Sequence, residues 1–311
     1  MLLLHAEHRQ PTLTATYASL RNHWQAITLE IQRLEEENNR IFIDAYGLKG
    51  ELEPGVPLHQ ITLTCNPHYR YGAGKSDAEY EALLLADTVR EFVSYAVGCM
   101  VGRYSLDKPG MILANQGETV EDYMARVATV EGLGTIAFLP DRDNVLPILD
   151  GDWFEDDIVD RFKRFLRVTF GETHYTENLA FVEQALGRDL RSYFLREYYD
   201  DHVKRYQKRP IYWLFSSPKG SFNALIYMHR YRYDTVSVVL NDYLRDFRSK
   251  LVAHKLHLEQ VSISASATPK DRTAALKETD KLDRMIADLT EYEDKILYPL
   301  ATQQAAERGK S

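Results

Sequence analysis

The chain has 311 residues, of which 44% are hydrophobic and 27% are charged, and this balance excludes a disordered or fibrous protein. No run of about 18 consecutive apolar residues occurs, so the sequence predicts neither a membrane span nor a signal peptide. The two cysteines match no metal-binding spacing and are few for a secreted chain of this length, so we expect a cytoplasmic protein.

Charge is unevenly distributed along the chain. The net charge of −8 argues against a protein that coats nucleic acid without specificity. Residues 141–160 carry eight acidic side chains against Arg142 alone. Residues 196–255 carry twelve Lys and Arg against six Asp and Glu, with tyrosines interleaved. The second region is therefore the part of the chain suited to meet a polyanion.

The first predicted element is a helix of about thirty residues, because apolar side chains recur three and four positions apart. They form one stripe with a polar residue, Asn38, inside it: Tyr17, Leu20, Trp24, Ile27, Ile31, Leu34, Ile41 and Ala45. Gly47 is placed to end the helix. Such a stripe must pack either on the rest of this chain or on a neighbour that is not part of it.

The stretch "TCNPHYRYGAGKS", residues 64–76, contains near-copies of two enzyme signatures. Gly74-Lys75-Ser76 matches the end of a phosphate-binding loop, but Tyr69 occupies the position of the required first glycine. Ser76-Asp77-Ala78-Glu79 instead fits a capping box, and an apolar run from 80 to 97 follows it. We therefore expect a helix to begin at Ser76.

The other near-copy, Asn66-Pro67-His68-Tyr69, differs by one residue from the Asn-Pro-Pro-Tyr of adenine-specific DNA methyltransferases. His68 replaces the proline that shapes the loop around a flipped adenine. The residues ahead of Asn66, most of them predicted to be helical, are too few to hold the half that binds the methyl donor. The interpretation that we prefer is a strand end bounded by Pro67. We assign no catalytic and no cofactor-binding residue to this chain.

The central region predicts short elements. Helices are expected around 119–128, 153–169, 175–186 and 188–206, and strands at 134–140 and 144–150. Two aromatic and β-branched runs, 211–217 and 221–229, are joined by Pro218-Lys219-Gly220 and predict a β-hairpin. The acidic group of Asp150, Asp152, Asp156 and Asp157 is interpreted as a solvated helix start, and no metal site is assigned.

The C-terminal region predicts two long helices. The first follows Asp234; the second is capped by Thr268, has Pro269 at its first position and is expected to stop before Pro299. A short link between them makes an antiparallel helical hairpin. We predict a mainly α, α+β fold with three parts: 1–55, a long helix and linker; 56–233, a mixed domain with a basic hairpin; and 234–311, the helical hairpin and a polar tail.

The predicted hairpin has cationic ends, which can lie against phosphates or enter a groove. An ordinary charged rim around an aromatic core explains the same pattern. The candidate DNA-binding residues lie before the hairpin, at its turn and after it: Lys204, Arg205, Lys208, Arg209, Lys219, Arg230, Tyr231 and Arg232.

Several long words resemble a known family in order along the chain. They are "LEEENNRIFIDAYGL", "EFVSYAVGCMVGRYSLDKPGMILANQGET", "DNVLPILDGDWFEDDIV", "VKRYQKRPIYWLFSSPKGSFNALIYMHRYRYDTV" and "ALKETDKLDRMIADLTEYEDKILYPLA". Together they resemble the C-terminal part of PglX, the adenine-specific DNA methyltransferase of BREX phage-defence systems. The first word also resembles a helix found in type II restriction-modification methylases.

The resemblance implies a non-catalytic portion that takes part in target recognition or acts as a spacer. S-adenosylmethionine is then expected in an upstream methyltransferase domain and not in this chain. The implied partners are double-stranded DNA, that methyltransferase domain upstream or in trans, and other BREX components, with no membrane. Two alternatives stay open: a protein-interaction scaffold of the defence complex, and a methyltransferase that acts through Asn66-Pro67-His68-Tyr69.

Overall fold

The computed structural model describes residues 2–4, 8–130, 132, 134–264 and 266–308. Part of the predicted polar tail, residues 309–311, lies outside them. The chain divides into two compact units, formed by residues 1–95 with 166–190 and by residues 96–165 with 191–311. The three-part division at residues 55 and 233 stays a prediction.

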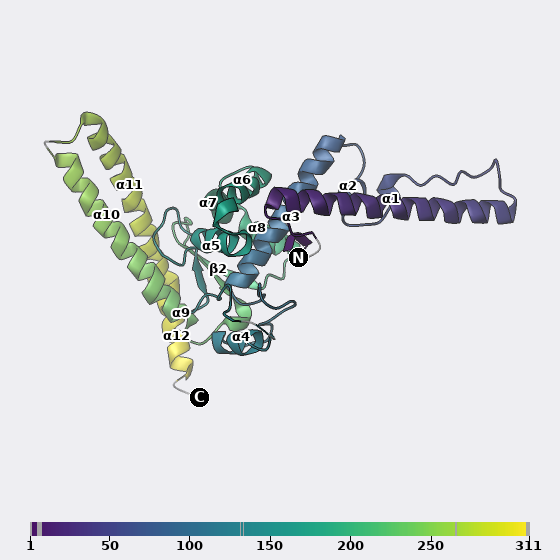
Figure 1. Ribbon diagram of the computed structural model, residues 1–311. Coiled ribbons are helices and arrows are strands. Elements are labelled where there is room, and N and C mark those ends of the chain that lie inside the picture. Colours follow the sequence, from purple (N-terminus) through teal and green to yellow (C-terminus); the bar gives the residue numbers. More distant parts are fainter. Residues whose placement is uncertain (1, 5–7, 131, 133, 265, 309–311) are drawn as a thin grey trace. The chain divides into compact units, whose positions relative to one another are not determined.

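The first unit is helical. Its longest helix, α1, spans Leu13–Tyr46, begins after a Thr12 cap and ends at Gly47, whose φ of 69° is left-handed. This confirms the predicted long helix and its stop (Figure 1). The other helices of the unit are α2 (Pro67–Arg70), most of α3 (Asp77–Met100), the end of α5 (Ile158–Phe170) and α6 (Tyr175–Leu186).

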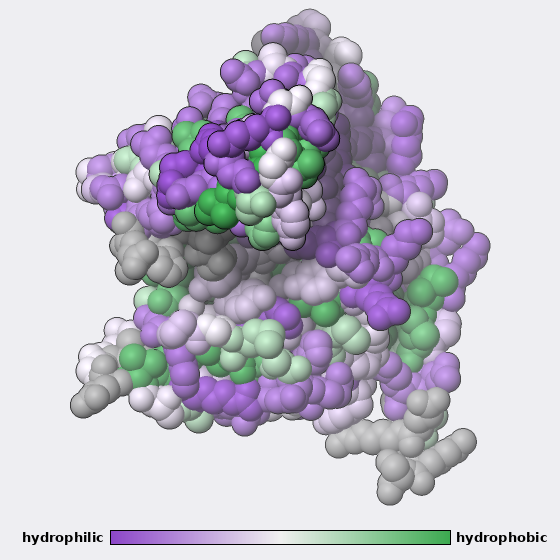
Figure 2. Space-filling model, turned by 90° about the vertical axis from the view of Figure 1, so that its right-hand side faces the viewer, coloured by the Kyte–Doolittle hydropathy of each residue, from purple (hydrophilic) through white to green (hydrophobic). Residues whose placement is uncertain are grey.

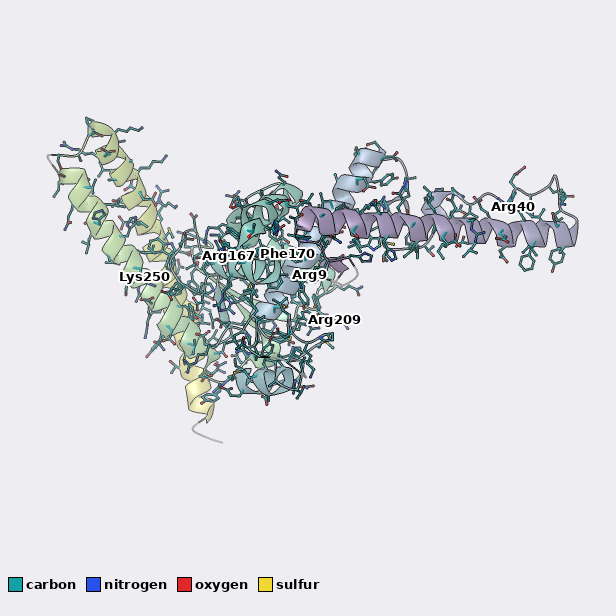
Figure 3. The ribbon with its side chains drawn as sticks, viewed as in Figure 1. Arg9, Arg40, Arg167, Phe170, Arg209 and Lys250 are labelled. Carbon is teal, nitrogen blue, oxygen red and sulfur yellow. The ribbon has the colours of Figure 1, made fainter. Side chains whose placement is uncertain are left out.

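The N-terminal half of α1 is held within this unit. The Leu13 N–H donates to Asn178 Oδ1 of α6 (2.7 Å), and Arg21 Nε donates to Glu81 Oε2 of α3 (2.8 Å). The apolar stripe is buried here at Leu13, Leu20 and Trp24. In the same unit, Arg9 lies over the ring of Phe170, and Arg167 lies over that of Tyr175 (Figure 3).

Helix α3 begins where the capping box predicts. Ser76 Oγ accepts from the Glu79 N–H (3.3 Å), and the Glu79 carboxylate accepts from the Ser76 N–H (2.8 Å). Lys75 Nζ donates to the Tyr71 carbonyl (2.8 Å). Ser76 and Lys75 thus hold a helix start and the turn before it, as the capping interpretation requires.

The second unit is built around a three-stranded antiparallel sheet in the order β1-β3-β2, formed by Val145–Pro147, Asn223–Tyr227 and Tyr212–Ser216. Strands β2 and β3 form the predicted hairpin, with Tyr212 opposite Tyr227 and Ser216 opposite Asn223. Every residue of the central strand β3 is buried, so both faces of the sheet are covered. The strand predicted at 144–150 is confirmed by β1.

The helices of this unit are α4 (Val120–Val127), the first part of α5, most of α7 (Leu190–Arg196), α8 (Tyr198–Arg205), α9 (Thr235–Val238), α10 (Arg245–Ile263), α11 (Pro269–Tyr292) and α12 (Tyr298–Arg308). Helices α10 and α11 form the predicted antiparallel hairpin (Figure 1). Its base packs on the sheet, where Ala224 and Ile226 share one apolar core with Phe247 and Leu289. In the described residues, no helix is both long and apolar enough to cross a membrane.

Two π-helical segments interrupt the long helices of the hairpin, at Val239–Leu244 and Glu293–Leu297. The second one corrects a prediction, because the chain does not stop being helical before Pro299. A proline lacks an N–H and collides with the carbonyl four residues earlier in a regular helix. The wider π turn ends at Leu297, immediately before α12, so the helix continues past the proline.

Three local predictions are wrong. Residues 134–140 form no strand where the structure describes them, because side chains bind their backbone: Asp107 accepts from Ala137 N–H, and Arg161 donates to the Leu139 carbonyl. The helix predicted at 188–206 is broken at Glu197, whose φ of −127° is not helical. Helix α5 begins at Ile158 instead of 153, after Asp157 accepts from the Val159 N–H.

One carboxylate joins the hairpin turn to the helical hairpin. Asp288 of α11 is fully buried, and its oxygens accept from Ser217 Oγ (2.6 Å), Lys219 N–H (3.1 Å) and Ser221 N–H (3.3 Å). Burial alone would raise the pKa of Asp288, but these hydrogen bonds outweigh it and lower the pKa. The ionised carboxylate is therefore part of the folded structure.

We expect Asp288→Ala to lower the free energy of unfolding by about 2–4 kcal/mol, because buried donors lose their acceptor. Asp280→Ala, an exposed position on the same helix, should change it by less than about 0.5 kcal/mol. Urea unfolding followed by circular dichroism measures both variants. Equal stability of the two would show that the turn does not depend on this carboxylate.

Candidate nucleic-acid interface

Four of the predicted DNA-binding cations come from one short segment at the end of α8. Lys204 and Arg205 lie in the last turn of the helix, and Lys208 and Arg209 lie in the turn that follows it. The Lys208 N–H donates to the Val203 carbonyl (2.9 Å), which closes the turn. All four side chains are exposed, and Figure 3 labels Arg209.

The backbone of this segment has an unusual conformation. Gln207 and Lys208 have φ values of 49° and 65°, in the left-handed region that non-glycine residues rarely occupy. The Arg209 N–H donates to the Tyr206 carbonyl (2.9 Å), so the turn is held by hydrogen bonds on both sides of Gln207. The chain therefore reverses sharply between the two pairs of cations.

Three of these cations are not neutralised by salt bridges. Within the described part of the chain, no carboxylate forms an ion pair with Lys204, Lys208 or Arg209. Lys204 and Arg205 also stabilise the C-terminal end of α8 through its dipole. An exposed group of unpaired cations is the electrostatic feature that polyanion binding requires.

A buried histidine fixes residues 204–209, called the basic turn below, to the sheet. His202 Nε2 accepts from the backbone N–H groups of Ile211 and Tyr212 (both 3.2 Å). Only the neutral imidazole has a ring nitrogen that can accept, so His202 is neutral in this arrangement. Its ring lies 4.4 Å from that of Tyr212 and 4.7 Å from that of Tyr206. Burial, together with the charge of Arg205, lowers the pKa of His202 to about 4.

The remaining predicted residues are not all at the same place. Tyr231 and Arg232 follow β3 at the end of the hairpin where β2 begins, which is also where the basic turn enters. Lys219 lies in the turn at the other end of β2, about 17 Å along a five-residue strand. The structure thus places seven of the eight residues toward one end of the hairpin, since Arg230 also follows β3, and separates Lys219 from them.

Arg230 differs from the others because it is buried, with 4% of its surface exposed. Its guanidinium donates to the carbonyls of Val101 (3.2 Å) and Arg142 (3.1 Å), and burial lowers its pKa. In this position it supports the loop after β3 and does not present its charge to solvent. Arg232, by contrast, is exposed and lies 3.6 Å from Asp234.

An exposed aromatic residue that the sequence analysis did not select lies beside these groups. Trp213 on β2 is 42% exposed, and its ring centroid is 5.6 Å from that of Tyr231. The Tyr231 hydroxyl accepts from Gln304, and its carbonyl accepts from Gln116 (3.3 Å). The sequence pattern could have identified Trp213, because adjacent residues of a strand point to opposite faces and its neighbour Tyr212 is buried.

The prediction of a solvated helix start is wrong for Asp156 and Asp157, whereas Asp150 and Asp152 of the same group are exposed. Asp157 is 1% exposed and binds Arg191 (3.0 Å), and Asp156 lies 2.6 Å from the hydroxyl of the buried Tyr243. Burial and the neighbouring Asp143 raise the pKa of Asp141 to about 7. These carboxylates hold the unit together.

The methyltransferase-like stretch also has a structural role. Asn66 is fully buried; its Nδ2 donates to the carbonyls of Leu58 (2.7 Å) and Ile61 (2.9 Å), and its Oδ1 accepts from the His68 N–H (3.1 Å). Residues 67–70 form the short helix α2, so the predicted strand end is wrong. Every polar atom of this amide is engaged within the chain.

Two known proteins are similar to this chain over most of its length. The adenine-specific methyltransferase BrxX of Escherichia coli O9:H4 (strain HS) is 34% identical over 295 residues, which is 90% of this chain. The adenine-specific methyltransferase PglX of Lacticaseibacillus casei (strain Zhang) is 30% identical over 300 residues, or 93% of this chain. The chain is a homologue of these methyltransferases.

The homology covers a limited part of the relatives. The chain spans 24% of the length of the BrxX protein and 22% of that of the PglX protein. No family model matches the chain. The predicted resemblance to the PglX methyltransferases is confirmed.

The titration of His202 gives a test of the anchor. Below about pH 6.5 the unfolded chain binds a proton at this histidine, whereas the folded chain does not until pH approaches 4. The free energy of unfolding should therefore fall by roughly 2–3 kcal/mol from this group as pH falls through that window. Urea unfolding at several pH values measures the dependence.

His202→Gln is the matched variant, because its side-chain oxygen can accept the same N–H groups without titrating. We expect its stability to depend less steeply on pH than that of the parent chain between about 6.5 and 4. If the free energy of unfolding depended on pH equally in the two proteins, the dependence would not arise from His202.

Arg230 and Arg232 separate a buried role from an exposed one. Arg230→Ala should lower the free energy of unfolding by about 2–4 kcal/mol, because two buried carbonyls lose a charged donor. Arg232→Ala should change it by no more than about 0.5 kcal/mol. Chemical unfolding of both proteins decides this, and a stable Arg230→Ala variant would refute the supporting role.

Proposed function

We propose that this chain is the non-catalytic, DNA-engaging C-terminal portion of an adenine-specific methyltransferase of a BREX phage-defence system. The observation that carries the proposal is the exposed group of cations at the end of α8 and on the turn after it. The names of the two relatives support methylation of adenine as the activity of the whole protein. We place its action on double-stranded DNA in the cytoplasm.

Catalysis is assigned to another part of the protein. A methyltransferase of this class needs a free Asn amide and an adjacent loop to receive the flipped adenine. In this chain the Asn66 amide is buried and makes three hydrogen bonds to backbone groups. We propose that S-adenosylmethionine and the adenine are bound by a methyltransferase domain that lies upstream or acts in trans, alongside other BREX components.

The geometry of the basic turn suits contact with the sugar-phosphate backbone. Lys204, Lys208 and Arg209 project from a backbone that is closed by hydrogen bonds and anchored to the sheet through His202. Preorganised cations bind phosphates with less loss of conformational entropy than cations on a mobile loop. This contact positions the protein on DNA without reading its sequence.

Sequence reading is proposed for the neighbouring side chains. Arg232 is exposed and can offer two donors to one base edge, which is the geometry that recognises guanine in the major groove. The exposed Trp213–Tyr231 pair offers flat apolar surface beside it. Arg230 is left out of this face because it is buried, and Lys219 because it lies at the far end of the hairpin.

The proposal predicts the effect of removing the four cations together. Lys204, Arg205, Lys208 and Arg209 are replaced by Ala, and binding to a fluorescent duplex is measured by anisotropy over a range of salt concentrations. We expect weaker binding that is nearly uniform across duplex sequences. The slope of log K against log salt should be smaller by about 0.9 for each phosphate that the variant no longer neutralises.

A charge-matched control uses exposed basic residues elsewhere in the same unit. Replacing Lys270, Lys277, Arg284 and Lys295 by Ala removes the same net charge from α11 and the segment after it. This variant should keep most of the affinity and the salt slope. Equal losses in both variants would show that net charge, and not the basic turn, governs binding, and no loss in either would refute the proposal.

A further inference from the structure

The apolar seam of α1 continues beyond the part that the unit covers. Leu13, Leu20 and Trp24 are buried, but farther along the same seam Ile27 is 37% exposed, Leu34 45% and Ile41 61%. These three residues are seven apart, so they recur on one side of the helix. Figure 2 looks along α1 from its C-terminal end and shows hydrophobic and hydrophilic residues side by side at that end.

The chain covers the opposite face of this half of α1. The segment after the helix runs back along it: Gln32 Nε2 donates to the Val56 carbonyl (2.7 Å), and Asn39 Nδ2 donates to the Pro54 carbonyl (3.2 Å). The Val56 N–H donates to Glu36 Oε1 (3.2 Å). At 100° per residue these three side chains lie about 150° around the helix from the seam. The returning segment therefore leaves the seam open.

The seam has the pattern of a coiled-coil interface. Ile27, Leu34 and Ile41 occupy one core position of the heptad, and Ile31, Asn38 and Ala45 occupy the other. An asparagine at a core position lowers stability but selects a partner that offers a polar group at the same level. A seam of this kind is suited to one specific helix more than to general apolar adsorption.

The residues that flank the seam decide which helix fits. Glu30, Glu37 and Asp44 line one side, and Glu35 lies on the other. A parallel second copy would place Glu30 against Glu35 of that copy, and an antiparallel one would place the three acidic residues against each other. The charges therefore disfavour self-association and favour a partner with basic flanks.

The acidic flanks are partly engaged within the helix. Arg33 pairs with Glu30 (2.9 Å) and Glu37 (2.8 Å), Arg40 with Glu36 (3.4 Å), and Lys49 with Asp44 (3.0 Å). Figure 3 labels Arg40 on this part of α1. Such exposed pairs contribute little free energy, typically about 0.3–0.5 kcal/mol, so a partner can replace them.

We propose that the seam of Ile27, Leu34 and Ile41 is a docking site for an amphipathic helix whose apolar stripe is flanked by Lys or Arg. The helix belongs to another polypeptide. The inference does not depend on the contact between the basic turn and DNA. It assigns to the N-terminal helix a function in assembly.

The test uses a synthetic helix of about four heptads with Ile and Leu at its core positions, one core Asn and Lys at every flanking position. Its lysines repel one another, so it should remain monomeric alone. A second peptide carries Glu at the same flanking positions. Fluorescence anisotropy of each labelled peptide with the full chain gives the dissociation constants.

We expect the lysine peptide to bind saturably and at least about tenfold more tightly than the glutamate peptide, with a difference that shrinks at high salt. Leu34→Glu combined with Ile41→Glu should weaken binding at least about tenfold. Leu29→Glu, an exposed leucine outside the seam, should leave the affinity within about twofold. Circular dichroism verifies that all variants are folded.

Four outcomes would overturn the inference. These are no saturable binding of the lysine peptide, equal binding of both peptides, and binding that the double glutamate variant retains. The fourth is a dimer in sedimentation equilibrium that the double glutamate variant dissociates, because it would identify a second copy as the occupant.

Discussion

The second unit depends on a carboxylate that has no solvent to stabilise its charge. Asp288 lies in the core of the unit, and the donors that neutralise it all come from the turn between β2 and β3. The hydrogen bonds hold that turn against α11, and the register of the two strands then follows from the turn. Ile211 and Tyr212, where β2 begins, bind His202 through their N–H groups. The position of the basic turn therefore also depends on β2.

The elements that the sequence predicts well are those with a local cause. Thr268 and Pro269 begin α11 through a capping box, Ser76 begins α3, and Pro218-Lys219-Gly220 closes the hairpin. In each case the residues that specify the structure are neighbours in the chain. The errors at 134–140 and near Pro299 have the opposite origin, because side chains distant in sequence and a change of helix type decide them.

The candidate interface was predictable as a set of charges but not as a surface. Composition identified Lys204 and Arg209, and periodicity identified the hairpin beside them. The sequence could not show that Arg230 turns inward to two carbonyls. Nor could it show that the half-buried Asp156 binds Tyr243 and that the buried Asp157 binds Arg191. The sequence shows that a side chain is charged, but only the folded structure shows whether that side chain is buried or exposed.

The segment that runs back along α1 has a consequence for binding kinetics and entropy. An isolated helical extension frays, because few contacts oppose the gain in backbone freedom. Residues 54–56 bind three side chains of that extension and so keep the helix formed before any partner arrives. A docking helix would bind a helix that is already formed, so only the docking helix itself would lose conformational entropy on binding. A seam of three large apolar residues can then suffice for an encounter that is specific and still reversible.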